Sequence, residues 1–182
     1  MSIPNYSGCY TDVVGCPKLF EDLEAILGVV WNELSSKLGN NPCSNDMQTY
    51  VSLPAVAADN CNIVAVFPDG VSVQKGNTIS QQYVLRRTRI QAGILVLFDG
   101  YPNVDVVDNV PIFPGSGELH LASKFLTSLA WCVMCALLDA MADGTLLGTN
   151  DISLDGNILN MELLQPEGTC AGFLITIEVY RD

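Results

Sequence analysis

Hydrophobic and polar residues follow a helical spacing in the first part of this chain. Pro17 suits the first position of a helix, and apolar residues then recur every three or four positions as far as Leu38. This spacing predicts an amphipathic helix that ends at Gly39. Glu33 precedes Lys37 by four residues, so we expect an ion pair worth about 0.2 to 0.5 kcal/mol between them.

The middle of the chain has the composition and alternation of β-strands. We predict strands over 49–53, 62–67, 71–73 and 83–98. Pro68-Asp69-Gly70 separates the second of these strands from the third, and this sequence predicts a reversal of the chain. Gly93 lies inside the longest strand and predicts a bulge or a close approach of another group to the backbone.

The most apolar stretch runs from Leu119 to Met141 and includes ten consecutive apolar residues, 129–138. We predict a helix with Ser116 or Gly117 as its N-cap, Glu118 complementing its dipole and Gly144 ending it. A helix that is apolar all round is a buried helix. We therefore expect other layers of this chain, or of a neighbouring copy, to cover it. The apolar run is shorter than the ~18 residues that span a bilayer, so no membrane partner is expected.

The C-terminal part again reads as strands, over 151–154, 158–164 and 173–180. The last two are predicted to form a hairpin joined by the 165–170 loop. One face of the final strand consists of Phe173, Ile175, Ile177 and Val179. The order of helix, several strands, helix and strands predicts a single α+β domain over 1–182, with two helices against one mainly antiparallel sheet. Residues 1–15 are expected to form an N-terminal arm.

Residues 99–117 are rich in Pro, Gly and Asp and are longer than ordinary connections within a domain. Two interpretations have equal weight. In one, the segment is a surface excursion packed by its own Val and Ile residues. In the other it is a loop that contacts a partner, because such contacts are often made by long loops. The candidate contact residues are then Asp105, Asp108 and Phe113.

The charge of the chain narrows the classes of partner. Twenty acidic residues against eight Lys and Arg give a net charge of −12. Such a surface repels nucleic acid and anionic lipid, so a general DNA-binding function is not expected. The first 15 residues lack a basic segment followed by an apolar one, as a secretory signal would have. We therefore expect synthesis in the cytosol.

Three of the eight basic residues, Arg86, Arg87 and Arg89, lie together in one predicted strand. Alternation places Arg87 and Arg89 on one face and Arg86 on the other. They either pair with nearby carboxylates of the same chain or form bidentate ion pairs with acidic groups of a neighbouring copy. The second interpretation is slightly favoured.

Candidate catalytic and metal-binding motifs are weak. Cys132 and Cys135 have the W-C-x-x-C form of a thioredoxin-like redox motif, but they fall three turns inside a predicted helix instead of at its N-terminus. His120 is the single histidine, which argues against a zinc site or a Ser/His/Asp triad. Gly115-Ser116-Gly117 lacks the Lys-Ser/Thr of a P-loop. We predict no catalytic residue, cofactor or metal site, and most of the seven cysteines are expected to be reduced.

Three landmarks carry a resemblance to a known family. They are LPAVAADNCNIVAVFP (53–68), FPGSGELHLASK (113–124) before the apolar helix, and QPEGTCAGF (165–173) leading into the last strand. Together they resemble the tail terminator or head-to-tail connection proteins of long-tailed actinobacteriophages. The matching positions are Asp59 and Cys61 of a D-x-C segment, and Gly168, Cys170 and Gly172 of a G-x-C-x-G turn. The resemblance spans roughly residues 15 to 182.

The resemblance implies a structural virion protein, not an enzyme. Such proteins form a ring, typically of six copies, that caps the tail tube, ends its growth and joins the tail to the neck. The implied partners are further copies of the chain, the tail tube protein and the neck or connector proteins, and DNA would pass through the lumen without specific binding. The alternatives are an adjacent connector or stopper ring of the same virion and, from the residues alone, a redox protein that uses Cys132 and Cys135.

Overall fold

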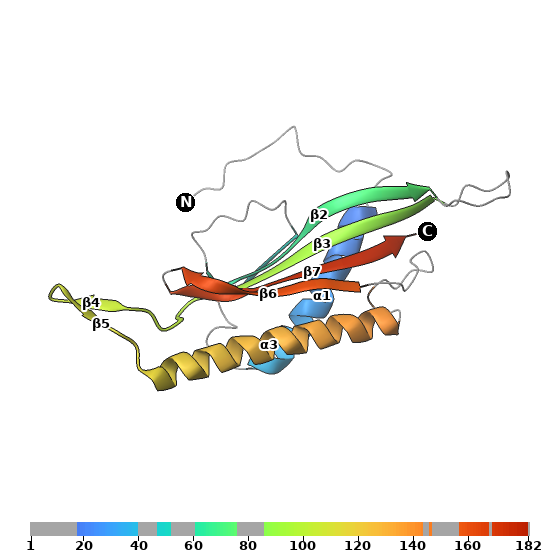
Figure 1. Cartoon of the computed structure of the whole chain (residues 1–182). Helices are drawn as coiled ribbons and strands as arrows, with labels where there is room; N and C mark the ends of the chain where they lie inside the picture. The colour runs from blue at the N-terminus through green and yellow to red at the C-terminus, as the bar shows by residue number, and fades with distance from the viewer. Residues whose placement is uncertain are drawn as a thin grey trace, which may run out of the picture.

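The protein is an α+β domain in which two helices pack on a mixed, mostly antiparallel sheet (Figure 1). The computed structural model describes residues 18–39, 47–51, 61–75, 86–143, 146, 157–167 and 169–181. The sheet has the strand order β1-β2-β3-β7-β6; β1 and β2 are parallel and every other pair is antiparallel. The elements are α1 (Lys18–Leu38), β1 (Gln48–Val51), β2 (Ile63–Lys75), β3 (Arg86–Phe98), β4 (Asp105–Val107), β5 (Val110–Ile112), α3 (Ser116–Ala142), β6 (Asn157–Glu167) and β7 (Cys170–Arg181).

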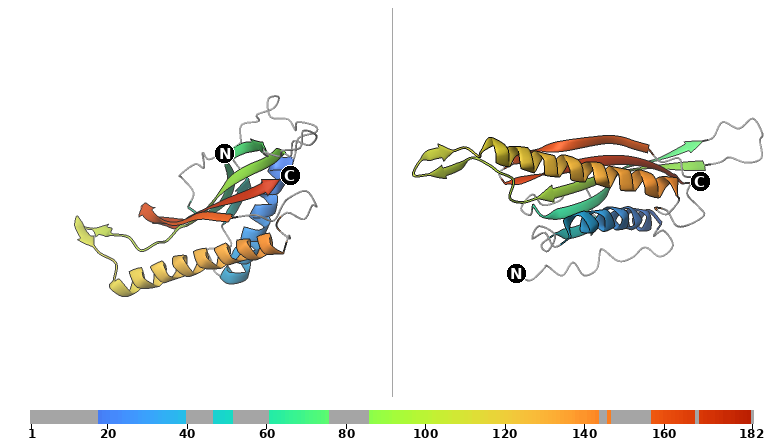
Figure 2. Two further views of the ribbon diagram at one scale, coloured as in Figure 1. Left: turned by 45° about the vertical axis from the view of Figure 1, so that its right-hand side comes forward. Right: turned by 90° about the horizontal axis from the view of Figure 1, so that it is seen from below.

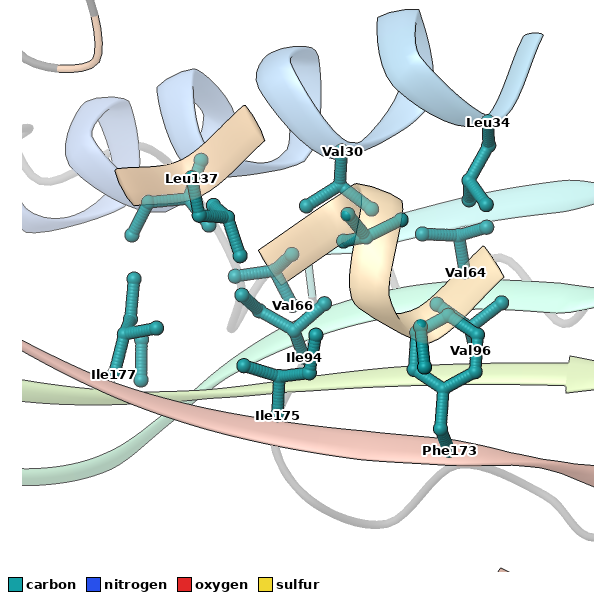
Figure 3. Close-up of a cluster of buried hydrophobic side chains, with 14 of the residues drawn as sticks. Val30, Leu34, Val64, Val66, Ile94, Val96, Leu137, Phe173, Ile175 and Ile177 are labelled. Atoms are coloured by element: carbon teal, nitrogen blue, oxygen red, sulfur yellow. The ribbon is translucent and has the colours of Figure 1, made fainter. Parts of the chain in front are cut away.

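Both helices lie on the same face of the sheet (Figure 2). The core fills the space between them and the sheet, where Val30 and Leu34 of α1 and Leu137 of α3 point toward the strands (Figure 3). The strands contribute the alternate, fully buried residues that the period of two predicted. On β7 these are Phe173, Ile175, Ile177 and Val179.

The amphipathic character of α1 is confirmed. The helix begins at Lys18, directly after Pro17, and its residues Leu23, Ile26 and Val30 are buried. Gly39 follows the last helical residue with φ +52°, a conformation that glycine adopts at helix C-termini without steric cost. The expected ion pair is present, with Lys37 Nζ 3.4 Å from Glu33 Oε1.

The predicted reversal at Pro68-Asp69-Gly70 is wrong. The chain continues through these residues as one strand, β2, and the register against β3 shifts between Pro68 and Gly70. Asp69 is the extra residue of a β-bulge. The segments before and after the bulge both pair with β3. On the other edge of β2, β1 pairs only with Ile63–Val66 and ends before Pro68. Among the described residues, therefore, no strand on that edge would need the N–H that Pro68 lacks.

Gly93 of β3 confirms the expected close approach. It lies opposite Phe67 of β2, and a Cβ added at Gly93 would stand 2.4 Å from ring atoms of Phe67. The Phe67 ring therefore covers the glycine on the face of the sheet opposite the helices. Gly172 of β7 is still more restricted, because a Cβ there would be 1.9 Å from the Val96 carbonyl oxygen.

The remaining boundaries differ in detail. The N-cap of α3 is Gly115, one residue earlier than the predicted Ser116 or Gly117, and the Glu118 carboxylate accepts a hydrogen bond from the Gly115 N–H at 3.0 Å. The predicted hairpin of the last two strands is confirmed as β6 and β7. The expected N-terminal arm (1–15), the helix end at Gly144 and the strand at 151–154 lie outside the described residues.

Candidate functional site

The segment between β3 and α3 contains a β-hairpin that the sequence pattern did not predict. β4 and β5 are joined by Asp108 and Asn109, which have φ values of +52° and +65°. Positive φ at both central residues defines a type I′ turn, whose twist matches that of the flanking strands. Asp and Asn are among the residues that tolerate this conformation, so Asp108-Asn109 between two valine-containing runs was the signal that could have revealed the hairpin.

The hairpin projects beyond the end of the sheet and beyond the N-terminus of α3 (Figures 1 and 2). We call residues 104–113 the projecting hairpin. Cross-strand pairing places Val107 and Val110 on one of its faces and Val106 and Pro111 on the other. Both faces are exposed: the exposed fraction is 63% for Val106 and 72% for Phe113. Two strands alone are at best marginally stable in water, so this hairpin is suited to packing against something else.

The root of the hairpin is held by hydrogen bonds to Asn62, just before β2, and to the turn before β7. Asp99 N–H donates to Asn62 Oδ1 at 3.0 Å, and Tyr101 N–H donates to the Thr169 carbonyl oxygen at 2.8 Å. The Thr169 hydroxyl and the Gly100 N–H donate to Asp99 Oδ1, and these bonds lower the pKa of the Asp99 carboxyl below its ordinary value, the hydroxyl having the larger effect. The hairpin therefore projects from a fixed base.

A disulfide bond joins Cys61 to Cys170 beside this root. These are the two cysteines of the D-x-C and G-x-C-x-G segments quoted above, and they are 109 residues apart. Of the four cysteines within the described residues, two are thus oxidised, whereas most were expected to be reduced. Cys132 and Cys135 are free thiols, and the other three lie outside the described residues.

The outward face of α3 carries several uncovered apolar side chains. The face toward the sheet and α1 is buried from Leu126 to Met141, but apolar side chains also follow the opposite face at helical spacing. We call this second set the outer face of α3. It comprises Leu121, Phe125, Trp131, Cys132, Cys135 and Leu138. Phe125 stands at its edge, where it also meets Phe98 of β3, the two cysteines are half-buried, and the polar residues Lys124, Ser128 and Asp139 are exposed among the apolar ones.

We expected other layers to cover α3. The described chain itself covers one face of the helix and leaves the outer face exposed. Leu121 and Trp131 have exposed fractions of 67% and 57%. By length and composition α3 is apolar enough to cross a membrane, a test that core helices of soluble proteins also pass. The uninterrupted run of ten apolar residues, on which the expectation of no membrane partner was based, is much shorter than the apolar length of the whole helix. A bilayer is thus a competing occupant for the outer face.

A hollow of about 210 Å³ lies where the hairpin root meets α3, lined by Tyr101, Phe125 and the end of β3. Phe98 and Phe125 meet there edge to face, with 5.6 Å between ring centroids. Its volume is below the ~300 to 1,000 Å³ of typical small-molecule pockets. A second hollow, of about 410 Å³, lies under the hairpin between Ile112, Phe113 and Glu118. The first hollow lies between the hairpin root and α3, and the second lies between the hairpin and the first turn of α3.

The arginine cluster lies on β3, away from the hairpin. Arg89 forms an ion pair with Glu178 of β7, and Gln91 Nε2 donates to the same carboxylate at 3.5 Å. The Glu178 side chain is 5% exposed and that of Arg89 34%. Arg89 therefore has a partner within its own chain. The backbones of Arg86 and Arg87 continue the strand, and the role of all three in an interface stays a prediction.

The other candidate residues are not brought together. Asp105 and Asp108 are exposed on the projecting hairpin, and His120 is exposed near the start of α3. Cys132 and Cys135 lie in the middle of α3, far from the helix N-terminus that a thioredoxin-like motif requires. Among the described residues, no group of three or more His, Cys, Asp and Glu side chains could hold a metal ion. The distinguishing chemistry of the described surface is exposed apolar area.

No protein-family model matches the chain, and no curated protein matches it in sequence.

Proposed function

We propose that the protein is a structural subunit of a ring, of about six copies, at the head-proximal end of a phage tail tube. In this role the ring ends tube growth and joins the tail to the neck, and the chain is not an enzyme. The proposal combines the resemblance to tail terminator and head-to-tail connection proteins with a surface suited to assembly. The finished product is a virion component that is made in the host cytosol.

The observation that supports assembly most strongly is the pair of uncovered apolar surfaces. A monomeric soluble protein rarely exposes a large contiguous apolar patch, and larger patches mark interaction sites. Here the projecting hairpin and the outer face of α3 are two different patches on one chain. When two different surfaces of identical subunits meet, the contact is heterologous, and its repetition closes a ring if the rotation permits.

The charge of the chain is compatible with a DNA passage. Six copies with a net charge of −12 each would carry −72. Non-specific DNA binding depends on lysine and arginine contacts to phosphate, so a lumen rich in carboxylates would let DNA pass without adhering. A terminator and an adjacent connector ring share this requirement.

Light scattering coupled to size-exclusion chromatography tests the proposal, followed by negative-stain imaging alone and with purified tail tubes. We expect a species several times heavier than 19.6 kDa, seen as rings, and rings bound at one end of the tubes. Rings that bind isolated necks but not tubes would favour the connector alternative. A monomer at high concentration that ignores both tubes and necks would refute the proposal.

A further inference from the structure

We propose that the projecting hairpin of one copy packs on the outer face of α3 of the next copy. This inference rests on the proposed function, since it names the contact between subunits of the ring. In one of the two interpretations of the sequence, residues 99–117 contact a partner, and under the family resemblance that partner would be the tail tube or the neck. The apolar match between the hairpin and α3 instead points to a second copy as the occupant.

The hairpin and the outer face of α3 both expose apolar side chains of the kind found in the core of a protein–protein interface. The hairpin presents β-branched side chains on both faces and Phe113 at its base, and the outer face of α3 presents Leu121, Phe125 and Trp131. Interface cores are enriched in aromatic residues and depleted in charge. Such an interface would remove from water the exposed apolar side chains of both elements.

The hairpin of the same chain cannot be the occupant. Its root is held by the bonds of Asp99 and Tyr101, and it lies beyond the N-terminus of α3 in each view (Figures 1 and 2). Two residues, 114 and 115, connect it to the helix, and two extended residues reach only about 7 Å. The outer face from Leu121 to Leu138 rises over about 26 Å. The hairpin is thus directed away from its own helix.

Charge and size also agree. The hairpin carries Asp105 and Asp108 and no basic residue, and Lys124 is exposed on α3 three residues after Leu121. The other two charged residues of α3 are acidic: Glu118 lies in its first turn and Asp139 lies beyond Trp131, so only the stretch around Lys124 complements the hairpin. A lysine on the helix face can meet the hairpin carboxylates in a chain that is otherwise strongly acidic. The four residues 104–107 extend about 13 Å, which equals about nine residues of helix rise. The hairpin is therefore nearly as long as the distance of about 15 Å from Leu121 to Trp131.

Mixing two complementary variants tests the inference. Val110→Asp breaks the hairpin side of the contact and Leu121→Asp the helix side; both positions are exposed, so the monomer should fold normally. Each variant alone should associate roughly tenfold more weakly or worse, because a carboxylate enters an apolar contact. An equimolar mixture retains one intact contact and should form one-to-one dimers but no rings. Phe20→Asp, exposed on α1, is the matched control and should assemble as the unchanged protein does.

Disulfide trapping gives a second readout in the full chain. With Cys9, Cys16 and Cys43 replaced by Ser, Val110→Cys should form an intermolecular disulfide with Cys132 or Cys135 of the next copy under mild oxidation. Adding Cys132→Ser and Cys135→Ser should abolish the crosslink. Ser36→Cys on the exposed side of α1 should give none.

The outcomes separate this inference from the proposed function. Rings that persist in Val110→Asp and Leu121→Asp overturn the inference and leave the ring function standing. Linear, unclosed assemblies of subunits that show the crosslink but never bind tail tubes support the inference and refute the proposed function. Dimers lost only with Leu121→Asp indicate pairing between two helices, and co-flotation with phosphatidylcholine vesicles without self-association indicates a membrane. Either result, or a monomer without any crosslink, overturns the inference.

Discussion

The two helices of this protein lie on the same face of one sheet but leave their outward sides in opposite states. α1 buries Leu23, Ile26 and Val30 and turns charged residues such as Glu24 to solvent. α3 buries an equivalent face but turns Leu121 and Trp131 outward. The sheet of the same chain can cover a helix that has one apolar face. A helix with two apolar faces needs a second layer to remove both of them from water. The proposed subunit contact lies on the side of α3 for this reason.

The largest expected effect compares the two faces of α3 at adjacent positions. Leu137 is fully buried and Leu138 is exposed. Leu137→Ala should lower the free energy of unfolding by about 3 kcal/mol, because it leaves a cavity, and Leu138→Ala by less than ~0.5 kcal/mol. Urea denaturation of the dilute monomer measures both. Equal losses would show that the outer face is covered within the monomer.

A second comparison concerns the face of the sheet opposite the helices. Arg89→Leu removes the ion-pair partner of the buried Glu178 carboxylate, which keeps its hydrogen bond from Gln91. The substitution should cost about 2 kcal/mol, less than for a fully buried pair, because Arg89 is one-third exposed and Gln91 remains. Arg89→Leu with Glu178→Leu should recover most of this loss, as measured by urea denaturation. Rings that form normally in the double variant would exclude Arg89 from the subunit interface.

A third comparison uses the one tryptophan on each helix. Trp31 of α1 is half-buried against the core, and Trp131 of α3 is exposed. In single-tryptophan variants made by Trp→Phe substitution, acrylamide should quench Trp131 more strongly than Trp31 in the monomer. On assembly only Trp131 should become protected, and either substitution should change stability by about 1 kcal/mol or less. Unchanged quenching of Trp131 in assembled rings would contradict a covered outer face.

The smallest effect concerns the fixed root of the projecting hairpin. Thr169→Val removes the hydroxyl that contributes most to the lowered pKa of Asp99, so this pKa should rise toward its ordinary value. Because the pKa of Asp99 is lower in the folded protein than in the unfolded chain, its ionised carboxylate stabilises the fold at pH values above the ordinary pKa of Asp. This stabilisation is lost as the pH falls through the lowered pKa of the folded protein. NMR titration of the Asp99 side chain checks the shift. An unchanged pKa would assign it to the Gly100 N–H instead.

Local patterns were reliable wherever one residue spacing had one structural meaning. The three- and four-residue spacing before Gly39 predicted α1, and the alternation from Phe173 to Val179 predicted the buried face of β7. Gly93 inside a strand predicted the close approach that Phe67 makes. In each case the side chain's own geometry restricts the answer, so distant parts of the chain add little.

Local patterns failed where a distant partner decided between alternatives. Pro68-Asp69-Gly70 is a good turn, yet continuous pairing with β3 makes it a bulge. Cys61 and Cys170 are 109 residues apart, and only the pairing of β2, β3 and β7 brings them together. The ion pair between Arg89 of β3 and Glu178 of β7 likewise forms only because these two strands pair.

The amino-acid sequence by itself determined the α+β class, the two helices and the strongly acidic surface, because composition and periodicity are properties of short segments. The tertiary structure alone decided which face of α3 is covered, where the hairpin projects and which cysteines are joined. Burial is a relation between segments that are far apart in the chain, and its geometry does not exist until they pack. The proposed contact surface belongs to this second group, since it consists of the apolar side chains that remain exposed after the core is filled.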